Sequence, residues 1–403
     1  MKELANVSQL PGVLQAFYKN TEELKDKIAC GRILEDDIDS FTYKELRERV
    51  ENFSGYLQTI SSQGDSAILL AETHNDFLIA FYGCMLAGVV AVPCHVGNLR
   101  KMKKLKYIIE DCDAKLVIGL EKTISKFKPN LSEDLSLVSV ENSPSGCIYS
   151  EPDFSNDDIV FLQYTSGTTS DPKGVMVRFS NLLANLKMIQ ESFEWGRETI
   201  ICSWLPFYHD LGLIGMLLSP IYFGGTTYYL SPLEFIKKPT RWLQAISDLK
   251  ATAAGAPNFA FNHCIQRVKE EDCQNFDFSN LSVFFCGAEP IRLASLEEFA
   301  EKFAPYNFNY NALYPCYGMA EVVLFATGVD VQKPMFWHAF DAKDITNNIV
   351  TPVEAETSGS VKLVGCGFPT KGLDAEIVIV NPDTCEKIEN QVGEIWIAGS
   401  HLS

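Results

Sequence analysis

The chain has 403 residues, a formal net charge of −18, and hydrophobic and charged fractions of 46% and 21%. This length exceeds one ordinary domain, so we expect two or three packed units of a globular protein. The acidic excess argues against binding to nucleic acid or to an anionic membrane surface.

Helices and strands alternate through the first part of the chain. Thr42 and Glu45 form a capping box, which predicts that a helix begins there. The uncharged run 77–93 is short for a membrane span and contains Gly83 and Gly88. We therefore predict a buried helix over 78–87 with Gly88 as its C-terminal cap, then a buried strand over 89–92, and no stable membrane insertion. The remaining predicted elements here are a strand over 66–71, a basic helix over 100–111 and a strand over 115–120.

The polar stretch 128–157 is predicted to link two halves of the chain. After it the alternation resumes, with strands predicted over 159–163, 175–177, 200–203, 226–230, 251–255 and 282–286. Such alternation predicts an α/β fold of two doubly wound sheets covered by helices on both faces. Short strands and turns after residue 328 predict a small β subdomain. The predicted domains are therefore 1–150, 151–328 and 329–403.

Cysteine usage bears on the compartment. Twelve cysteines are spread from Cys30 to Cys385 with no Cys-x-x-Cys pair. That distribution favours reduced, mostly buried thiols over a disulfide framework or a zinc site. The first four residues, Met-Lys-Glu-Leu, lack the layout of a signal peptide. We predict a cytoplasmic protein.

The stretch 164–175, Tyr-Thr-Ser-Gly-Thr-Thr-Ser-Asp-Pro-Lys-Gly-Val, has the composition of a phosphate cradle. Hydroxyl and backbone N–H groups can donate to phosphate oxygens, Gly167 lets the backbone come close, and Lys173 adds positive charge. No Gly-Lys-Ser/Thr closes the stretch, so it is not a Walker A loop. Composition alone leaves a polar hairpin turn open. The order of residues resembles the signature loop of the adenylate-forming superfamily, which includes acyl-CoA synthetases, nonribosomal adenylation domains and luciferases.

Two apolar segments carry further resemblance. Residues 204–215 hold the pair His209-Asp210 among aromatic and small residues, which suits a polar site opening on an apolar tunnel. A lone histidine in such a run is otherwise a core side chain. The pattern Leu-Pro-x-x-His-Asp-x-Gly-Leu resembles fatty acyl-AMP ligases. Residues 255–261, Gly-Ala-Pro-Asn-Phe-Ala-Phe, are similar to the segment lining the acyl pocket of these enzymes, and a packed strand–helix junction is the alternative.

Two later segments resemble nucleotide-binding motifs of the same family. Residues 286–290, Cys-Gly-Ala-Glu-Pro, are alone a common exit from a strand, and they resemble the turn that contacts adenine and ribose. Residues 314–321 resemble the Tyr-Gly-x-x-Glu motif. The resemblance implies that Tyr317 stacks on adenine, that Glu321 binds magnesium, and that the hydroxyl of Thr165 completes the metal site.

These segments occur in the family's order, so we identify the chain as a member of the fatty acyl-AMP ligases, represented by an N-terminal part. The resemblance implies that a fatty acid is activated by ATP and Mg²⁺ to acyl-AMP, with release of pyrophosphate. It implies the catalytic residues His209, Lys173 and Glu321, and the acyl-binding residues Phe207, Ile214, Phe259 and Phe261. It implies the nucleotide-binding residues Thr165, Ser166, Gly167, Thr168, Thr169, Lys173, Gly287, Ala288, Glu289, Pro290, Tyr317, Gly318 and Met319.

The acyl acceptor depends on residues 330–360, which we interpret as the insertion found in fatty acyl-AMP ligases but not in CoA ligases. The resemblance implies transfer to an acyl carrier protein, or to the carrier domain of a polyketide or nonribosomal synthase. The sequence ends directly after a predicted strand, and we expect weak turnover because the family's C-terminal domain would follow. An acyl-CoA synthetase and a catalytically silent acyl-adenylate-binding scaffold are the alternatives.

Overall fold

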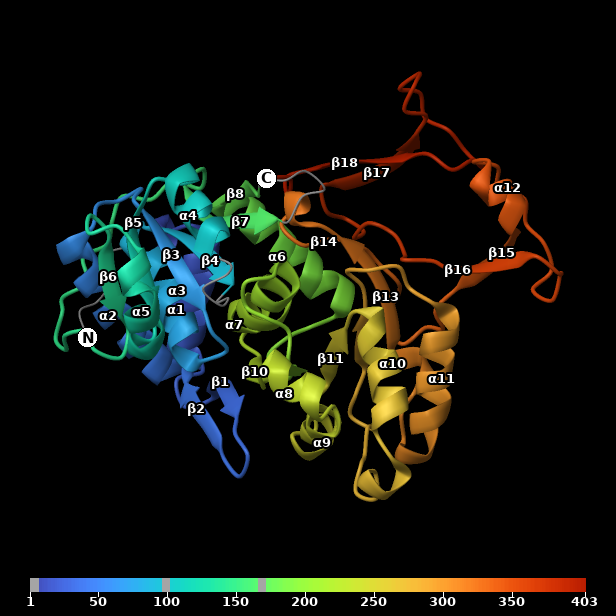
Figure 1. Ribbon diagram of the computed structural model, residues 1–403, viewed down its shortest axis with the longest axis horizontal. Coiled ribbons are helices and arrows are strands. Elements are labelled where there is room, and N and C mark those ends of the chain that lie inside the picture. The colour runs from blue at the N-terminus through green and yellow to red at the C-terminus, as the bar shows by residue number, and fades with distance from the viewer. Residues whose placement is uncertain (1–6, 96–101, 166–171) are drawn as a thin grey trace. The chain divides into compact units, whose positions relative to one another are not determined.

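The computed structural model describes residues 7–95, 102–165 and 172–403 (Figure 1). The chain forms two compact units. Unit 1 comprises Met1–Leu186, Gly196–Leu233 and Ser403, and unit 2 comprises Lys187–Trp195 and Glu234–Leu402. Both predicted domain boundaries, after residues 150 and 328, fall inside a unit, and the three-part division stays a prediction.

Unit 1 contains a sheet of six strands in the order β6-β5-β3-β4-β7-β8. All neighbours pair in parallel except β7 and β8, which are antiparallel. Helices cover this strand layer on both sides in Figure 1, as the apolar runs of its central strands require. The strands are β3 (Ser66–Ala71), β4 (Val90–His95), β5 (Ala114–Gly119), β6 (Ser136–Ser139), β7 (Ile159–Thr165) and β8 (Lys173–Arg178).

The predicted linker over 128–157 is wrong in one part. It contains β6, whose residues pair in parallel with β5 from Leu116↔Ser136 to Gly119↔Ser139. Only one of its four side chains is buried, so an edge strand of this kind has no long apolar run. Polar composition therefore hid a strand that pairing with the sheet stabilises.

A second group of strands in unit 1 follows the order β9-β10-β1-β2. The pairs β9–β10 and β10–β1 are parallel, and β1–β2 is antiparallel. Their bounds are β9 (Ile200–Ser203), β10 (Thr226–Tyr229), β1 (Ile28–Ile33) and β2 (Ile38–Thr42). The sequence did not predict β1 and β2, because β2 reads Ile-Asp-Ser-Phe-Thr and lacks a continuous apolar run.

Two predicted helix features are confirmed. The Thr42 side chain accepts from the Glu45 N–H while the Glu45 carboxylate accepts from the Thr42 N–H, which is the predicted capping box. The buried helix α3 ends at Gly88, which has φ 74° and serves as the left-handed C-cap. Among the helices that the structure describes, none is long and apolar enough to span a bilayer.

The bounds of the helices follow here. They are α1 (Gly12–Glu23), α2 (Tyr43–Ile60), α3 (Asn75–Ala87), α4 (Met102–Asp111), α5 (Glu121–Phe127), α6 (Phe179–Phe193), α7 (Ser219–Phe223), α8 (Pro232–Lys237), α9 (Thr240–Asp248), α10 (Asn258–Arg267), α11 (Leu293–Phe303) and α12 (Ala342–Thr346).

Unit 2 is built on the strands β11 (Ala253–Ala256), β12 (Val283–Cys286), β13 (Leu313–Gly318) and β14 (Phe325–Gly328). The first three pair in parallel, and β14 pairs antiparallel with β13. Helices α10 and α11 lie side by side against these strands (Figure 1). The core between them is aromatic: the ring centroids of Phe284 and Phe299 are 5.1 Å apart.

The end of unit 2 consists of two separate antiparallel strand pairs, in agreement with the short strands predicted after residue 328. The strands are β15 (Trp337–Asp341) with β16 (Ser360–Val364), and β17 (Ala375–Val380) with β18 (Glu394–Gly399). The predicted insertion 330–360 is less irregular than expected, because it holds both β15 and α12. The α/β fold with helix-covered sheets is confirmed, with antiparallel edges that the sequence pattern did not indicate.

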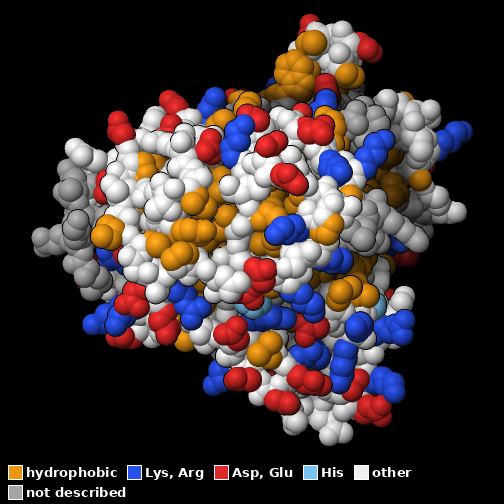
Figure 2. Space-filling view, turned by 60° about the vertical axis from the view of Figure 1, so that its left-hand side comes forward, with side chains coloured by type: hydrophobic (Ala, Val, Ile, Leu, Met, Phe, Trp, Pro, Cys, Tyr) orange, Lys and Arg blue, Asp and Glu red, His pale blue; other side chains and the backbone are white. Residues whose placement is uncertain are grey.

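The surface carries both signs of charge despite the acidic excess. Figure 2 shows Lys and Arg side chains interspersed with Asp and Glu, and apolar side chains between them, on the face that it displays.

Candidate functional site

The root of the predicted phosphate loop is a hairpin. Strands β7 and β8 pair antiparallel, and their last pair is Thr165↔Lys173. Lys173 is exposed and Thr165 is partly buried. The predicted loop residues Ser166, Gly167, Thr168 and Thr169 lie outside the described residues. The hairpin geometry is compatible with both interpretations of this stretch, and it places a hydroxyl and an ammonium group at the two ends of the loop.

Successive residues of β7 point to opposite faces of the sheet, and Gln163 is one that the sequence analysis missed. Its side chain is 3% exposed. Its Nε2 donates to the carbonyl oxygen of Tyr208 at 2.9 Å. Its Oε1 is buried and has no hydrogen-bond partner in the described part of the chain. The strand that precedes the predicted phosphate loop is thereby bonded to the residue before His209.

We expect Gln163→Leu to lower the rate of the predicted acyl-AMP formation about tenfold, because the Tyr208 carbonyl loses its donor and His209, the next residue, loses its support. Pyrophosphate release measures the rate. The matched control is Gln58→Leu, which removes an amide that donates to Ser150 at 2.6 Å outside the predicted site. Equal rates in the two variants would refute the role of Gln163.

The chain after β9 places the predicted His-Asp pair at the start of an unusual helix. The segment η4 (Leu211–Leu218) is a π-helix. Such helices are rare in proteins, and those that occur often lie at functional sites. The Asp210 carboxylate accepts from the Leu211 N–H at 2.7 Å and so caps the N-terminus of η4. A Cβ at Gly212 would lie 2.2 Å from the carbonyl oxygen of Pro206. Glycine is therefore required for this approach of the backbone.

The surroundings of His209 favour the protonated, positively charged imidazole. Its side chain is 53% exposed, and its Nδ1 pairs with Oδ1 of Asp210. That hydrogen bond raises the pKa of His209, and burial opposes it more weakly. A second histidine lies nearby: the ring centroids of His95, at the end of β4, and Tyr208 are 4.5 Å apart. The sequence contained no motif around His95 that could have indicated this proximity.

We expect Asp210→Asn to reduce stability more at about pH 5.5 than at about pH 8.5. The folded pKa of His209 is raised, so the pair stabilises the fold fully below the unfolded pKa of about 6.5. That contribution is lost as the pH rises through the folded pKa. Because the side chain is half exposed, we expect a difference below about 1 kcal/mol. Urea unfolding at both pH values measures it. Asp113→Asn, which breaks an exposed pair with Lys115, is the control and should show no such pH dependence.

The predicted acyl-binding residues of unit 1 are buried. The Phe207 ring stacks on Phe77 at 5.3 Å and meets Tyr229 edge-on at 4.9 Å. Ile214 is fully buried within η4. Both side chains therefore lie in an apolar interior next to the segment that carries His209.

The predicted acyl-binding residues of unit 2 differ from one another. Phe261 packs edge-on against Phe284 and Phe299 at 5.2 and 5.1 Å, which are the contacts of a core side chain. Phe259 is 42% exposed at the start of α10. Its N–H donates to Oε1 of Glu289 at 2.5 Å. The turn after β12 is thus joined to the segment predicted to line the acyl pocket.

The predicted adenine-binding turn has a demanding backbone. Ala288 has φ 66°, a left-handed conformation that is uncommon for a residue with a Cβ. A Cβ at Gly287 would lie 3.0 Å from Sγ of Cys316. Ala288, Glu289 and Pro290 are exposed.

The last residues of β13 and the loop after it present Tyr317, Met319 and Glu321. The Tyr317 O–H donates to Sδ of Met319 at 3.6 Å, and the Met319 N–H donates to the carbonyl oxygen of Leu324 at 2.9 Å. A Cβ at Gly318 would lie only 1.8 Å from that same oxygen. The loop can close only because residue 318 is glycine.

A strained turn follows Glu321. Val323 has φ 69° and ψ −61°, and the Leu324 N–H donates to the carbonyl oxygen of Val322 at 2.9 Å. This is a γ-turn of the rare form, which is strained and more so for a β-branched residue. Such strain costs about 1–3 kcal/mol and clusters at functional sites. Glu321 lies in the short helix η8 (Ala320–Val322) immediately before it.

The donor set suits magnesium held mainly by phosphate oxygens. Glu321 is exposed, and no ion pair involves it among the described residues. Within the described ranges, no group of three or more His, Cys, Asp or Glu side chains could hold a metal ion. Magnesium prefers oxygen ligands and commonly uses one or two carboxylates together with substrate phosphates. The Glu321 carboxylate is an oxygen donor of this kind.

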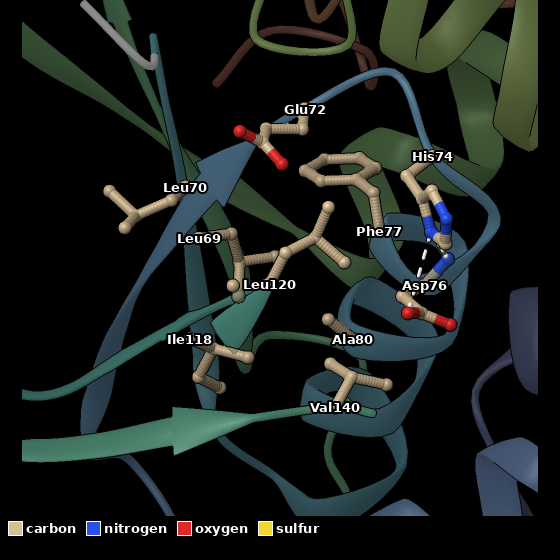
Figure 3. A pocket seen from close by; sticks show the side chains of 11 residues that line it. Leu69, Leu70, Glu72, His74, Asp76, Phe77, Ala80, Ile118, Leu120 and Val140 are labelled. Carbon is tan, nitrogen blue, oxygen red and sulfur yellow. Dashed lines mark hydrogen bonds and ion pairs between the residues drawn. The ribbon is translucent and has the colours of Figure 1, made fainter. Parts of the chain in front are cut away.

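A second histidine–carboxylate pair lies at the carboxyl end of β3. Figure 3 shows His74 and Asp76 facing one another. Nδ1 of His74 and Oδ2 of Asp76 are 3.4 Å apart. The adjoining cavity, also lined by Glu72 and Phe77, has a volume of about 10 Å³, which is room for a single water molecule. His74 also accepts from the Asp76 N–H and caps α3. We interpret this pair as a helix cap.

The comparisons with known proteins bear on the family of the chain. A sequence model of the family described as "AMP-binding enzyme" matches residues 17–403. The chain is 34% identical over 391 residues to the medium-chain-fatty-acid–[acyl-carrier-protein] ligase JamA of Moorena producens, covering 92% of this chain and 64% of that protein. It is 30% identical to the putative fatty-acid–CoA ligase fadD25 of Mycobacterium tuberculosis, covering 98% of this chain and 70% of that protein.

A solved structure shares the whole described fold. The fatty acyl-adenylate ligase from L. pneumophila, solved in complex with acyl adenylate and pyrophosphate, superimposes with a TM-score of 0.92 at 33% identity. The match covers 99% of this chain and 70% of that one. The chain thus spans about two thirds of the length of the relatives that it matches. On the extent of the family match and of this structural likeness, the chain belongs to the AMP-binding enzyme family.

Proposed function

We propose that this chain activates a fatty acid with ATP, forming acyl-AMP and pyrophosphate. The observation that carries the proposal is its likeness, over nearly the whole chain, to a ligase solved with acyl adenylate and pyrophosphate. The residues predicted for that chemistry support it: Thr165 ends β7, Lys173 begins β8, and His209 follows a residue whose carbonyl accepts from Gln163.

In the proposed reaction, a carboxylate oxygen of the fatty acid attacks the α-phosphorus of ATP, and the bond to the pyrophosphate oxygen breaks. The carboxylate is already ionised near pH 7, so no general base is needed. The difficulty is bringing two anions together, which requires positioning and neutralisation of charge. The raised pKa of His209 favours an imidazolium that donates to the carboxylate or to the α-phosphate.

The other charged groups act on the phosphates. Lys173, exposed at the start of β8, supplies positive charge to the β- and γ-phosphates and then to the departing pyrophosphate. Glu321, together with Thr165, would hold magnesium. When bound, the ion neutralises charge on the phosphate oxygens. Tyr317 would stack on adenine, and the backbone of residues 287–290 would contact the nucleoside.

The alkyl chain would be bound by burial. Phe207 and Ile214 lie in an apolar interior beside His209, and Phe259 is exposed at the start of α10. Each methylene that leaves water contributes about 0.8 kcal/mol, so a long chain needs no polar anchor.

The proposed acceptor is the phosphopantetheine thiol of a carrier protein or of a synthase carrier domain. JamA is named as a ligase that uses an acyl carrier protein, and fadD25 is named as a CoA ligase, so CoA is the competing acceptor. The free state of all twelve cysteines supports the proposed location in the cytoplasm.

The test incubates the protein with ATP, Mg²⁺ and a panel of saturated fatty acids. Acyl-AMP formation is measured by pyrophosphate release and by mass spectrometry. We expect release that requires both ATP and fatty acid, and tight binding of a non-hydrolysable acyl-adenylate analogue. Offering CoA and a phosphopantetheinylated carrier protein in parallel then identifies the acceptor. Analogue binding without any acyl-AMP would favour the scaffold alternative, and absence of both would refute the proposal.

A further inference from the structure

Tyr164 covers the root of the hairpin that carries the predicted phosphate loop. It lies opposite Gly174 in the β7–β8 ladder, one pair before Thr165↔Lys173. A Cβ at Gly174 would lie 2.9 Å from Cζ of the Tyr164 ring. The ring therefore rests on the backbone of Gly174, a position open to it only because that residue has no side chain.

The Tyr164 hydroxyl anchors this hairpin to a neighbouring helix. It donates to Oδ2 of Asp111, the last residue of α4, at 2.5 Å. The same ring packs against an apolar cluster that includes Leu105 and Ile108 of α4. Burial, and after it this hydrogen bond, raises the pKa of Tyr164 well above its ordinary value. The phenol therefore stays protonated and able to donate throughout the physiological pH range.

We propose that Tyr164 and Asp111 are positioning residues that hold the hairpin in the geometry needed to bind the phosphates of ATP. The inference rests on the proposed function of the loop between Thr165 and Lys173. Neither side chain need touch the nucleotide, because the hydroxyl acts through the backbone of β7 and β8. A site held in place before its ligand binds avoids the cost of ordering it afterwards.

Because of this arrangement, we expect the Tyr164–Asp111 bond to affect the binding of ATP and not the binding of the fatty acid. The Tyr164–Asp111 bond acts on the hairpin and hence on ATP, whereas Gln163, on the opposite face of β7, acts on the segment before His209. Loss of the bond is therefore expected to raise KM for ATP and to leave KM for the fatty acid unchanged.

The test compares Tyr164→Phe, Asp111→Ala and Asp111→Asn. The first two remove the donor or the acceptor, and we expect each to raise KM for ATP and Kd for ATP about three- to tenfold. The double variant should be no worse than either single variant, because both remove the same bond. Asp111→Asn keeps an acceptor oxygen and should restore KM to within about twofold of the wild type.

Stability is measured on the same variants to separate positioning from folding. Tyr43→Phe is the matched control, since it removes a buried hydroxyl that donates to Gly225 at 2.7 Å outside the hairpin. We expect it to lower Tm without changing KM for ATP. If Tyr164→Phe fails to fold, Asp111→Ala with its asparagine rescue gives the same readout on the exposed end of the bond.

The possible outcomes distinguish a failure of the positioning role from a failure of the proposed function. A wild-type chain that neither binds nor uses ATP would overturn the proposed function. A wild type that does so, with unchanged KM for ATP in Tyr164→Phe and Asp111→Ala, would overturn the positioning role alone. Equal increases in KM for ATP and for the fatty acid would also contradict the positioning role, because a general loss of rigidity in the protein would affect both substrates.

Discussion

Glu321→Gln is expected to reduce the proposed magnesium-dependent acyl-AMP formation by about a hundredfold or more, which is the loss typical of removing one group that stabilises the reacting charge. The side chain is exposed, and the strained turn at Val323 follows it directly. Glutamine keeps the shape but loses the charge that a divalent cation prefers. Pyrophosphate release across a magnesium titration measures the effect.

The control for this variant is Glu301→Gln, because Glu301 is an exposed carboxylate on α11. It should leave the magnesium dependence unchanged. Both variants should keep the wild-type Tm, since surface substitutions usually change stability by less than about 0.5 kcal/mol. If Glu321→Gln retained wild-type rates at low magnesium, the assignment of Glu321 as a metal ligand would fail.

Gly318→Ala is expected to abolish measurable nucleotide binding and to destabilise the protein by about 2–4 kcal/mol. The added Cβ would lie 1.8 Å from the Leu324 carbonyl oxygen, which accepts from the Met319 N–H. The backbone must therefore move, and the end of β13 with Tyr317 and the following loop with Glu321 move with it. Calorimetric titration with ATP and urea unfolding measure the two effects.

Gly196→Ala provides the comparison for Gly318→Ala. A Cβ at Gly196 would meet no atom within 4 Å, so we expect a change in stability below about 0.5 kcal/mol and unchanged ATP binding. A Gly318→Ala variant that binds ATP like the wild type would show that this loop does not contribute to the nucleotide site.

Much of the fold was predictable because its signals are local. The run Ser66–Ala71 is a buried strand and was predicted with its exact bounds. The cap at Gly88 and the capping box at Thr42 were predictable for the same reason: each depends on a few adjacent residues. Strands whose stability comes from pairing, such as β2 and β6, carry no comparable signal and were missed.

The order of the motifs in the sequence by itself determined the family and the residue types at the candidate site, because phosphate, adenine and magnesium each demand particular groups in short segments. Only the tertiary structure decided how those groups are supported. Gln163 reaches Tyr208 across 45 positions of chain, and Tyr164 reaches Asp111 across 53. No local pattern encodes such contacts, since they exist only after the strands and helices pack together.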